Sequence, residues 1–277
     1  MTNSSLLDKI RESQLFVEKR ISHIPQTAIV FGSGLGSQGG LRISERVEIP
    51  YSKIPHFPQS TVQGHSGRLV FGKIGSRYCL IAEGRFHFYE GYSQEEVVFP
   101  VRVFKALGTQ NLILTNSAGA LNPTYKVGEL VLVKDHINFT GHNPLRGQNE
   151  ESLGPRFPDL TEAYNPDLCK KLKTAANRLK YKLKYGVYVG ISGPSYETPA
   201  EIKMFRKWGG DLIGMSTVPE VIAAAHLGLP TAVISCVTNK LLPLSRKKLS
   251  HDQVLKSAKE IREKLYHLLE CFLCEQK

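Results

Sequence analysis

The stretch TAIVFGSGLG, residues 27–36, joins a short run of β-branched and aliphatic residues to a glycine-rich turn. The run predicts a strand, and the glycines that follow it allow the backbone to turn tightly. Such a turn presents backbone N–H groups and, with the Ser33 hydroxyl, suits an oxygen atom of a phosphate group. On its own the motif is equally typical of an ordinary turn. A dinucleotide site fits less well, because the further glycine of that fingerprint is missing near Gln38 and no helical pattern follows.

Short apolar runs of this kind alternate with longer helical patterns along the chain, which predicts a single α/β domain over residues 1–277. Helix starts are marked by four pairs with capping-box spacing, Ser93 with Glu96, Thr198 with Glu201, Thr217 with Glu220 and Ser250 with Gln253. Gly108 and Gly228 are placed to end two of these helices, and the last helix should run to about residue 274 and pack on the sheet. The other predicted strands are 67–74, 78–83, 111–116, 130–133, 186–191, 211–214 and 231–237.

The chain carries 36 Lys and Arg against 25 Asp and Glu, a net charge of +11. This balance raises the possibility of a nucleic-acid-binding protein. Much of the excess falls between residues 165 and 184, where lysines lie between helically spaced leucines, so a solvated helix face is the better interpretation. No helix-turn-helix, zinc-finger or stacking motif accompanies the lysines, and an anionic substrate explains the charge equally well.

Targeting and cysteine usage favour the cytoplasm. The first residues lack the apolar stretch of a signal peptide, and charges, Gly or Pro interrupt every apolar run that would be long enough to cross a membrane. Five cysteines are an odd number, which fits a reducing compartment better than a disulfide framework. Cys271 and Cys274 have the spacing of a redox or metal pair, but without a second pair two half-buried helical thiols are the stronger interpretation.

Polar motifs follow several of the predicted strands, and loops after strands gather at the edge of an α/β sheet where ligands bind. In GRFHFYEGY, residues 84–92, Arg85, His87 and Tyr89 alternate with two phenylalanines, so an extended segment would place them on one side. The alternative without a functional role is a half-buried edge strand with a polar outer face. Near an anion loop, Arg85 and His87 would form a phosphate clamp.

Three further motifs have small or polar residues where a strand should end. TNSAGA, residues 115–120, would let a flat ligand approach the backbone, or would be a simple exit turn. In GPSYETP, residues 193–199, Glu197 either complements a helix dipole or, beside the Tyr196 ring, accepts hydrogen bonds from a purine. In VTNK, residues 237–240, Thr238 and Asn239 are either ligand contacts or turn formers.

The start of the helix at Thr217 follows GMSTVPE, residues 214–220, which brings Ser216 to a helix mouth where free amides favour anions. Ser216 is otherwise only a neighbour of the cap. His251, just after the predicted cap at Ser250, is in isolation more typical of a helix surface.

Taken in chain order, GSGLG, GHSGRLVFG, GRFHFYEGY, TNSAGALNP, GPSYETPAE, GMSTVPE and TNK resemble the trimeric purine nucleoside phosphorylases that prefer 6-oxopurines. The resemblance runs from Thr27 to about Leu255. It implies one α/β domain around a central mixed, partly barrel-like sheet flanked by helices. It also implies reversible phosphorolysis of inosine and guanosine in purine salvage. Inorganic phosphate would be the co-substrate, and no metal or organic cofactor is expected.

The resemblance assigns site residues position by position. Phosphate contacts would come from Ser33, His65, Arg85, His87, Asn116, the backbone at Ser117, and Ser216. Ribose contacts would come from Tyr89, Met215, His251 and a neighbouring subunit's Phe157, so a homotrimer is expected. Base contacts would come from Tyr196, Glu197, Thr238 and Asn239, and the catalytic set from Asn239, Glu197 and His87.

The sequence differs from the family pattern at Tyr196, where phenylalanine is usual, and at Ser117, where alanine is usual. The basic stretch 240–248 lies where family members vary. A methylthioadenosine phosphorylase is the nearest alternative enzyme, and Asn239 and His251 argue against it because that relative has an acid at the first position and lacks the histidine. A basic nucleic-acid-binding protein is the alternative of another class, and a dinucleotide-dependent dehydrogenase is more distant.

Overall fold

The computed structural model describes residues 4–36, 40–59, 66–241 and 251–275, and the centre of this part of the chain is a β-sheet. Its strands are β1 (Thr27–Phe31), β2 (Ser44–Pro50), β3 (Arg68–Ile74), β4 (Arg77–Glu83), β5 (Asn111–Ala120), β6 (Leu130–Phe139), β7 (Lys184–Ile191), β8 (Leu212–Gly214) and β9 (Thr231–Lys240). They pair in the order β2-β3-β4-β1-β5-β8-β7-β6-β9, and β9 pairs in addition with β5. This last pairing closes β5, β8, β7, β6 and β9 into a ring.

The sheet is mixed as well as partly closed. β1 is parallel to β4 and β5, whereas β3 is antiparallel to β4, and β6 is antiparallel to β9. Helices cover it, so the predicted fold, an α/β domain with a mixed, partly barrel-like sheet flanked by helices, is confirmed.

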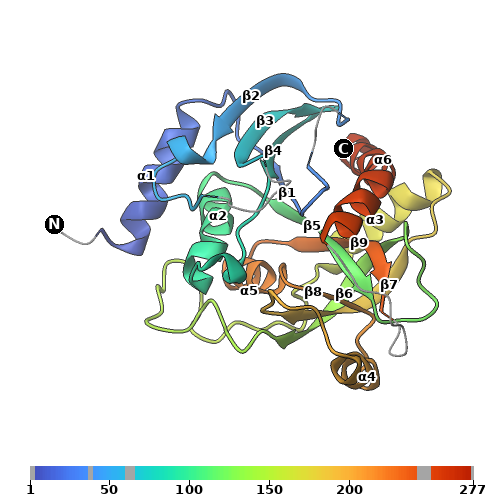
Figure 1. The fold of residues 1–277 in the computed structure, drawn as a ribbon. Helices are drawn as coiled ribbons and strands as arrows, with labels where there is room; N and C mark the ends of the chain where they lie inside the picture. The colour runs from blue at the N-terminus through green and yellow to red at the C-terminus, as the bar shows by residue number, and fades with distance from the viewer. Residues whose placement is uncertain (1–3, 37–39, 60–65, 242–250, 276–277) are drawn as a thin grey trace.

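Alternate residues of the central strands pack against different groups of helices. Ala28 and Val30 of β1 belong to one apolar cluster, and Ile29 and Phe31 belong to another, as the two-residue period of a strand requires. The first cluster includes residues of α1 (Leu6–Glu18), α2 (Gln94–Ala106) and α5 (Val218–His226), and the second includes residues of α3 (Pro166–Arg178) and α6 (His251–Glu275). Figure 1 shows the two groups on separate sides of the sheet. The short α4 (Pro199–Lys207) contributes Ile202 and Phe205 to a smaller cluster.

The helix boundaries follow the capping signals. The Ser93 hydroxyl accepts from the backbone N–H of Glu96 at 3.2 Å, and the Glu96 carboxylate accepts from the backbone N–H of Ser93 at 2.8 Å. Thr198 and Glu201 form the same reciprocal pair before α4. Gly108 and Gly228 have positive φ after α2 and α5, which glycine adopts without strain. The predicted cap at Ser250 lies outside the described residues.

The helix α1 and the strand β2 were not predicted, and three strands extend well past their expected ends. One is β6, expected over 130–133, which continues through Phe139, and the others are β5 and β9. α1 begins with a Ser5–Asp8 capping box, and β2 is a mostly exposed strand. β5 and β9 continue through Ala120 and Lys240. The interpretation of residues 115–120 and 237–240 as strand-ending turns is therefore wrong, because both segments are paired with each other inside the ring.

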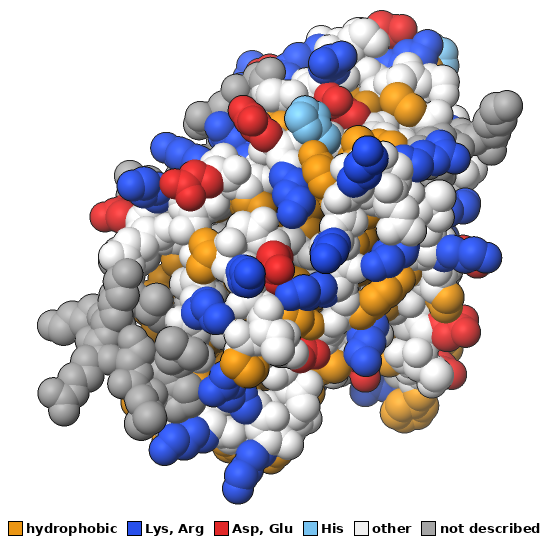
Figure 2. Space-filling view, turned by 90° about the vertical axis from the view of Figure 1, so that its right-hand side faces the viewer, with side chains coloured by type: hydrophobic (Ala, Val, Ile, Leu, Met, Phe, Trp, Pro, Cys, Tyr) orange, Lys and Arg blue, Asp and Glu red, His pale blue; other side chains and the backbone are white. Residues whose placement is uncertain are grey.

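The basic residues of α3 and of the loop that follows it are spread over a solvated surface, as predicted. Lys170, Lys171, Lys180 and Lys182 are exposed, and Figure 2 shows Lys and Arg scattered over the side of the molecule on which α3 and α6 lie. Among the described residues, no helix is long and apolar enough to span a bilayer.

Candidate active site

One pocket collects most of the residues singled out from the sequence. It encloses about 660 Å³, including space open to solvent, and is built by the ends of β1, β5, β8 and β9, the segment after β4, and the residues that precede α4 and α5. The predicted residues that line it are Ser33, Arg85, His87, Tyr89, Asn116, Ser117, Tyr196, Glu197, Met215, Ser216, Thr238 and Asn239.

Close contact between β1 and β5 forms the floor of this pocket. A Cβ atom on Gly32 would lie 2.9 Å from the Asn116 Cα and 3.0 Å from the Thr115 carbonyl oxygen, so the backbone after β1 approaches that of β5 as closely as glycine allows. The Thr115 hydroxyl donates to the Val30 carbonyl oxygen at 3.1 Å and ties the strands together. The turn after β1 is thereby held directly against the residues of β5 that line the pocket.

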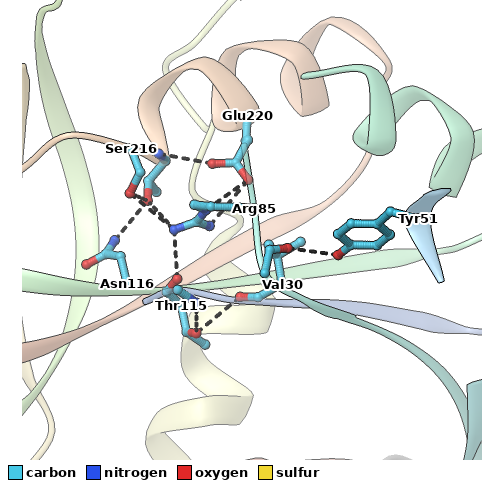
Figure 3. A network of polar contacts seen from close by, with 10 residues as sticks. Val30, Tyr51, Arg85, Thr115, Asn116, Ser216 and Glu220 are labelled. Atoms are coloured by element: carbon cyan, nitrogen blue, oxygen red, sulfur yellow. Dashed lines mark hydrogen bonds and ion pairs between the residues drawn. The ribbon is translucent and has the colours of Figure 1, made fainter. Parts of the chain in front are cut away.

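Arg85 is the centre of a buried polar network, which Figure 3 shows in full. Its Nη1 donates to the Thr115 carbonyl oxygen at 2.9 Å and to the Ser216 hydroxyl at 3.1 Å. Its Nε and Nη2 both lie 3.3 Å from Oε1 of Glu220, and the two side chains are almost fully buried. A buried cation requires a partner of this kind. The guanidinium is therefore fixed in one orientation beside the pocket.

Neighbouring side chains add further polar groups to the same part of the pocket. The Ser117 hydroxyl donates to the Ser33 carbonyl oxygen at 3.0 Å and joins the glycine-rich turn to β5. The Asn116 Nδ2 donates to the Thr217 hydroxyl at 3.0 Å. The buried Oδ1 of Asn116 has no hydrogen-bond partner among the described residues, so this amide offers an acceptor to a ligand.

His87 is held by a carboxylate. Its Nδ1 lies 2.8 Å from Oε1 of Glu90, and the same oxygen accepts from the His87 backbone N–H at 2.9 Å. Burial, together with the nearby Arg85, lowers the pKa of His87 despite the opposing effect of Glu90. The ring is therefore neutral at pH 7, with its Nδ1–H directed to Glu90. The segment is extended at His87 but turns at Phe88–Glu90, so the predicted alternation does not continue to Tyr89, whose ring stacks on His87 at 4.7 Å.

A carboxylate and an amide line another part of the pocket. Burial, with repulsion from Glu201 added, raises the pKa of Glu197, and its Oε2 is buried without a partner among the described residues. The Thr238 hydroxyl donates to Oδ1 of Asn239 at 3.0 Å. Nδ2 of this amide is then the group that can donate to a ligand. The Tyr196 ring is 40% exposed at the pocket edge.

Three predicted residues are not placed in this pocket. His65 and the side chain of His251 lie outside the described residues. Phe157 is 89% exposed and does not line the pocket of its own chain.

Sequence reasoning missed residues that support the pocket. Glu90 and Glu220 hold His87 and Arg85, and Thr217, considered only as a helix cap, contacts Arg85 through its hydroxyl at 3.3 Å. The signal for Glu220 was its capping-box spacing, and its carboxylate does accept from the Thr217 backbone N–H at 3.0 Å. The pocket also includes apolar Ile213, Leu241 and Val254, which carry no chemical motif.

The arrangement suits a ligand with two different polar parts. Arg85 and Ser216 offer donors to an anion, while Glu197 and Asn239 offer an acceptor and a donor to a planar heterocycle. Among the described residues, no group of three or more His, Cys, Asp or Glu side chains is placed to hold a metal ion.

Comparisons with known proteins agree with this geometry. The model of the Phosphorylase superfamily matches residues 26–273. Purine nucleoside phosphorylase 1 of Geobacillus stearothermophilus is 46% identical over 253 residues, which cover 91% of this chain and 92% of the relative.

Solved structures are similar along nearly the whole chain. A Schistosoma purine nucleoside phosphorylase in complex with hypoxanthine has a TM-score of 0.93 and 38% identity over 99% of this chain and all of its own. The Schistosoma mansoni enzyme in complex with inosine has a TM-score of 0.92 and 39% identity, with 98% and 97% of the two chains covered. The chain therefore belongs to the phosphorylase superfamily and, within it, to the family of the purine nucleoside phosphorylases.

Proposed function

We propose that the chain catalyses the reversible phosphorolysis of 6-oxopurine ribonucleosides and deoxyribonucleosides, such as inosine and guanosine, to the free base and the pentose 1-phosphate. In the cell this reaction would serve purine salvage. The observation that carries the proposal is that Arg85 and Ser216 line the same pocket as Glu197 and Asn239. The hypoxanthine and inosine in the two similar solved structures support purine nucleosides as substrates, and the preference for a 6-oxo group rests on Glu197 and Asn239.

Phosphate is proposed to bind where donors gather, at Ser33, Arg85, Ser216 and the backbone of Ser117, and beside His87, whose Nε2, the ring nitrogen that does not face Glu90, can accept the proton of HPO₄²⁻. As the glycosidic bond stretches, the ribose gains the positive charge of an oxocarbenium ion, and the bound anion stabilises it before acting as the nucleophile. Glu220 and Glu90 offset the charge of Arg85 and orient His87, so the donors keep their positions before substrate arrives. His65 is proposed to add a contact from outside the described residues.

The base takes up the electron pair of the glycosidic bond and so gains negative charge. The Glu197 carboxylate is suited to accept from N1–H of a 6-oxopurine. Nδ2 of Asn239 is suited to donate to O6, and its Oδ1, which has a second lone pair beside the one that Thr238 uses, is suited to accept from N7 once N7 is protonated. Loss of one such contact should cost about 3 kcal/mol of barrier, the scale of a single oxyanion donor. Tyr89, Met215 and His251 are proposed to contact the ribose between the two ends.

The remaining parts of the proposal concern partners and compartment. The donors above supply the charge stabilisation that the reaction needs, so we expect no metal or organic cofactor. The exposed Phe157 is proposed to complete the pocket of a neighbouring copy in a homotrimer. None of the five cysteines, all of which lie in the described residues, forms a disulfide bond, which suits a reducing compartment such as the cytoplasm.

The test is an assay of inosine cleavage with and without inorganic phosphate, repeated with guanosine, adenosine and methylthioadenosine. We expect cleavage to require phosphate and kcat/KM to be far higher for inosine and guanosine than for the two 6-amino compounds. Equal or reversed rates would reject the assignment in favour of a methylthioadenosine phosphorylase. Sedimentation of the full chain measures the expected trimer.

A further inference from the structure

Thr217, between β8 and α5, has a backbone conformation that threonine rarely adopts. Its φ is 75° and its ψ is −49°, and the backbone N–H of Val218 donates to the Ser216 carbonyl oxygen at 2.8 Å, so residues 216–218 form a γ-turn with positive φ. A β-branched residue is strained there, and the side chain is buried. Strain of this kind persists only where the surrounding contacts hold it, and it is concentrated at functional sites.

The turn places the Thr217 hydroxyl among three polar side chains of the pocket. The oxygen lies 3.0 Å from Nδ2 of Asn116, 3.3 Å from Nη1 of Arg85 and 3.0 Å from the Ser216 hydroxyl. Figure 3 shows Arg85, Asn116 and Ser216 lying close together. Thr217 itself does not line the pocket, whereas its three partners do.

Counting donors and acceptors fixes the direction of these hydrogen bonds. A hydroxyl group has one hydrogen and two acceptor lone pairs, whereas a guanidinium and an amide NH₂ group only donate. Nη1 of Arg85 has two hydrogens: one is donated to the Thr115 carbonyl oxygen, and the other is shared between the Ser216 and Thr217 hydroxyls as a three-centre hydrogen bond. This shared hydrogen and the Asn116 amide engage both lone pairs of Thr217, so the Thr217 hydrogen is donated to Ser216. Ser216 then accepts from Thr217 and, at 3.1 Å, from Arg85. Both of its lone pairs are engaged, so its own hydrogen is the group that it can offer, either to an anion in the pocket or to the Tyr188 hydroxyl.

We propose that Thr217 is a positioning residue, which orients the Ser216 hydroxyl so that it presents a hydrogen, and never a lone pair, to an anion bound in the pocket. The inference deepens the proposed function and rests on it in taking this anion to be inorganic phosphate. Without the Thr217 hydroxyl, Ser216 has a free lone pair that can face the phosphate oxygens and repel them. The strained turn is the cost of bringing a threonine hydroxyl to this place.

The test compares T217V, which keeps the branched shape but lacks the hydroxyl, with T217S, which keeps the hydroxyl and relieves part of the strain. Calorimetric titration of the full chain with inorganic phosphate alone measures affinity without catalysis. We expect T217V to weaken phosphate binding on the order of ten- to a hundred-fold, the scale of one hydrogen bond to a charged group. T217S should stay within about threefold of the unchanged protein, as expected where the hydroxyl is retained.

Steady-state kinetics and a double-mutant cycle separate positioning from general damage. In T217V the KM for phosphate should rise as the affinity falls, while the KM for inosine changes by less than about threefold. In an S216A background the T217V change should cause no further loss, because the effect acts through Ser216. If T217V does not fold, T217A carries the same expectations.

Three results would overturn the inference: phosphate affinity unchanged in T217V, equal losses in T217V and T217S, or independent losses from T217V and S216A. The Tyr188 hydroxyl is a competing acceptor for the Ser216 hydrogen, since burial raises the pKa of Tyr188 and Ser216 opposes that rise. A loss in Y188F as large as in T217V would therefore also contradict it. If the expected affinities are found but inosine is not cleaved, the reaction proposed above fails while the role of Thr217 stands.

Discussion

Replacement of Glu220 by Gln should separate the stability of the protein from its affinity for phosphate. Glu220 is the buried counter-charge of Arg85, with both guanidinium contacts at 3.3 Å and with exposed side-chain fractions of 5% and 2%. Removing one partner of such a pair costs about 3–5 kcal/mol. Gln keeps an acceptor for the Thr217 backbone N–H, so we expect the lower end, about 3 kcal/mol. For a chain of this size that loss corresponds to a fall in Tm of roughly 6 °C.

Phosphate should reverse part of this loss. With the carboxylate gone, the bound anion becomes the main counter-charge of Arg85, so phosphate should bind E220Q more tightly and raise its Tm more than it raises that of the unchanged protein. Thermal unfolding across a phosphate series measures both effects, and E260Q, which removes an exposed carboxylate of α6, serves as the matched control. An unchanged Tm, or the same phosphate-induced shift in E220Q and the control, would refute the reasoning.

Three further changes test other parts of the pocket. The Thr238 hydroxyl contacts Oδ1 of Asn239, so Nδ2 is the group left to donate to the ligand, and N239D replaces it by an acceptor. The ratio of kcat/KM for inosine to that for adenosine should therefore fall about tenfold or more. An unchanged ratio would contradict the role of Asn239. The ionised form of Glu197 accepts N1–H, and its pKa is raised. As the pH is lowered, inosine affinity measured without phosphate should therefore begin to fall at a higher pH than the titration of an ordinary glutamate predicts. E197Q should abolish this pH dependence, and a dependence that persists in E197Q would belong to another group. G32A should destabilise the protein by about 1–3 kcal/mol in denaturant unfolding, because its Cβ would press on Asn116, whereas G36A, with nothing within 4 Å, should not; equal effects would show that the strand contact is not the cause.

The sequence was most informative where chemistry and local structure coincide. Arg85, Glu197 and Asn239 stand in motifs distinctive enough to indicate a shared site, and the structure places them in one pocket. The capping boxes at Ser93 and Thr198 depend on contacts three residues apart, which spacing reveals. The Ser5–Asp8 box before α1 carried the same kind of signal and was overlooked.

Other features depend on contacts between distant segments, which a pattern of residue types does not contain. The segments after Asn116 and Val237 were expected to leave the sheet because small and polar residues favour turns, but ring closure between β5 and β9 keeps both in strands. The partner of Arg85 is Glu220, 135 positions away, and the positive φ of Thr217 runs against its own preference. The overruled local preferences thus lie at the pocket itself.

β2 was not predicted because it is rich in charged residues, and this composition also has a consequence for solubility. Within the described residues β2 pairs only with β3, so its outer N–H and C=O groups form the open edge of the sheet. Arg46 and Glu48 on this strand form an ion pair at 2.8 Å, and the pairing is irregular between Ser44 and Val47. Charged side chains and bulges are the features that prevent a free edge from recruiting strands of other molecules. The residues least typical of a strand are therefore those that keep this one from seeding aggregation.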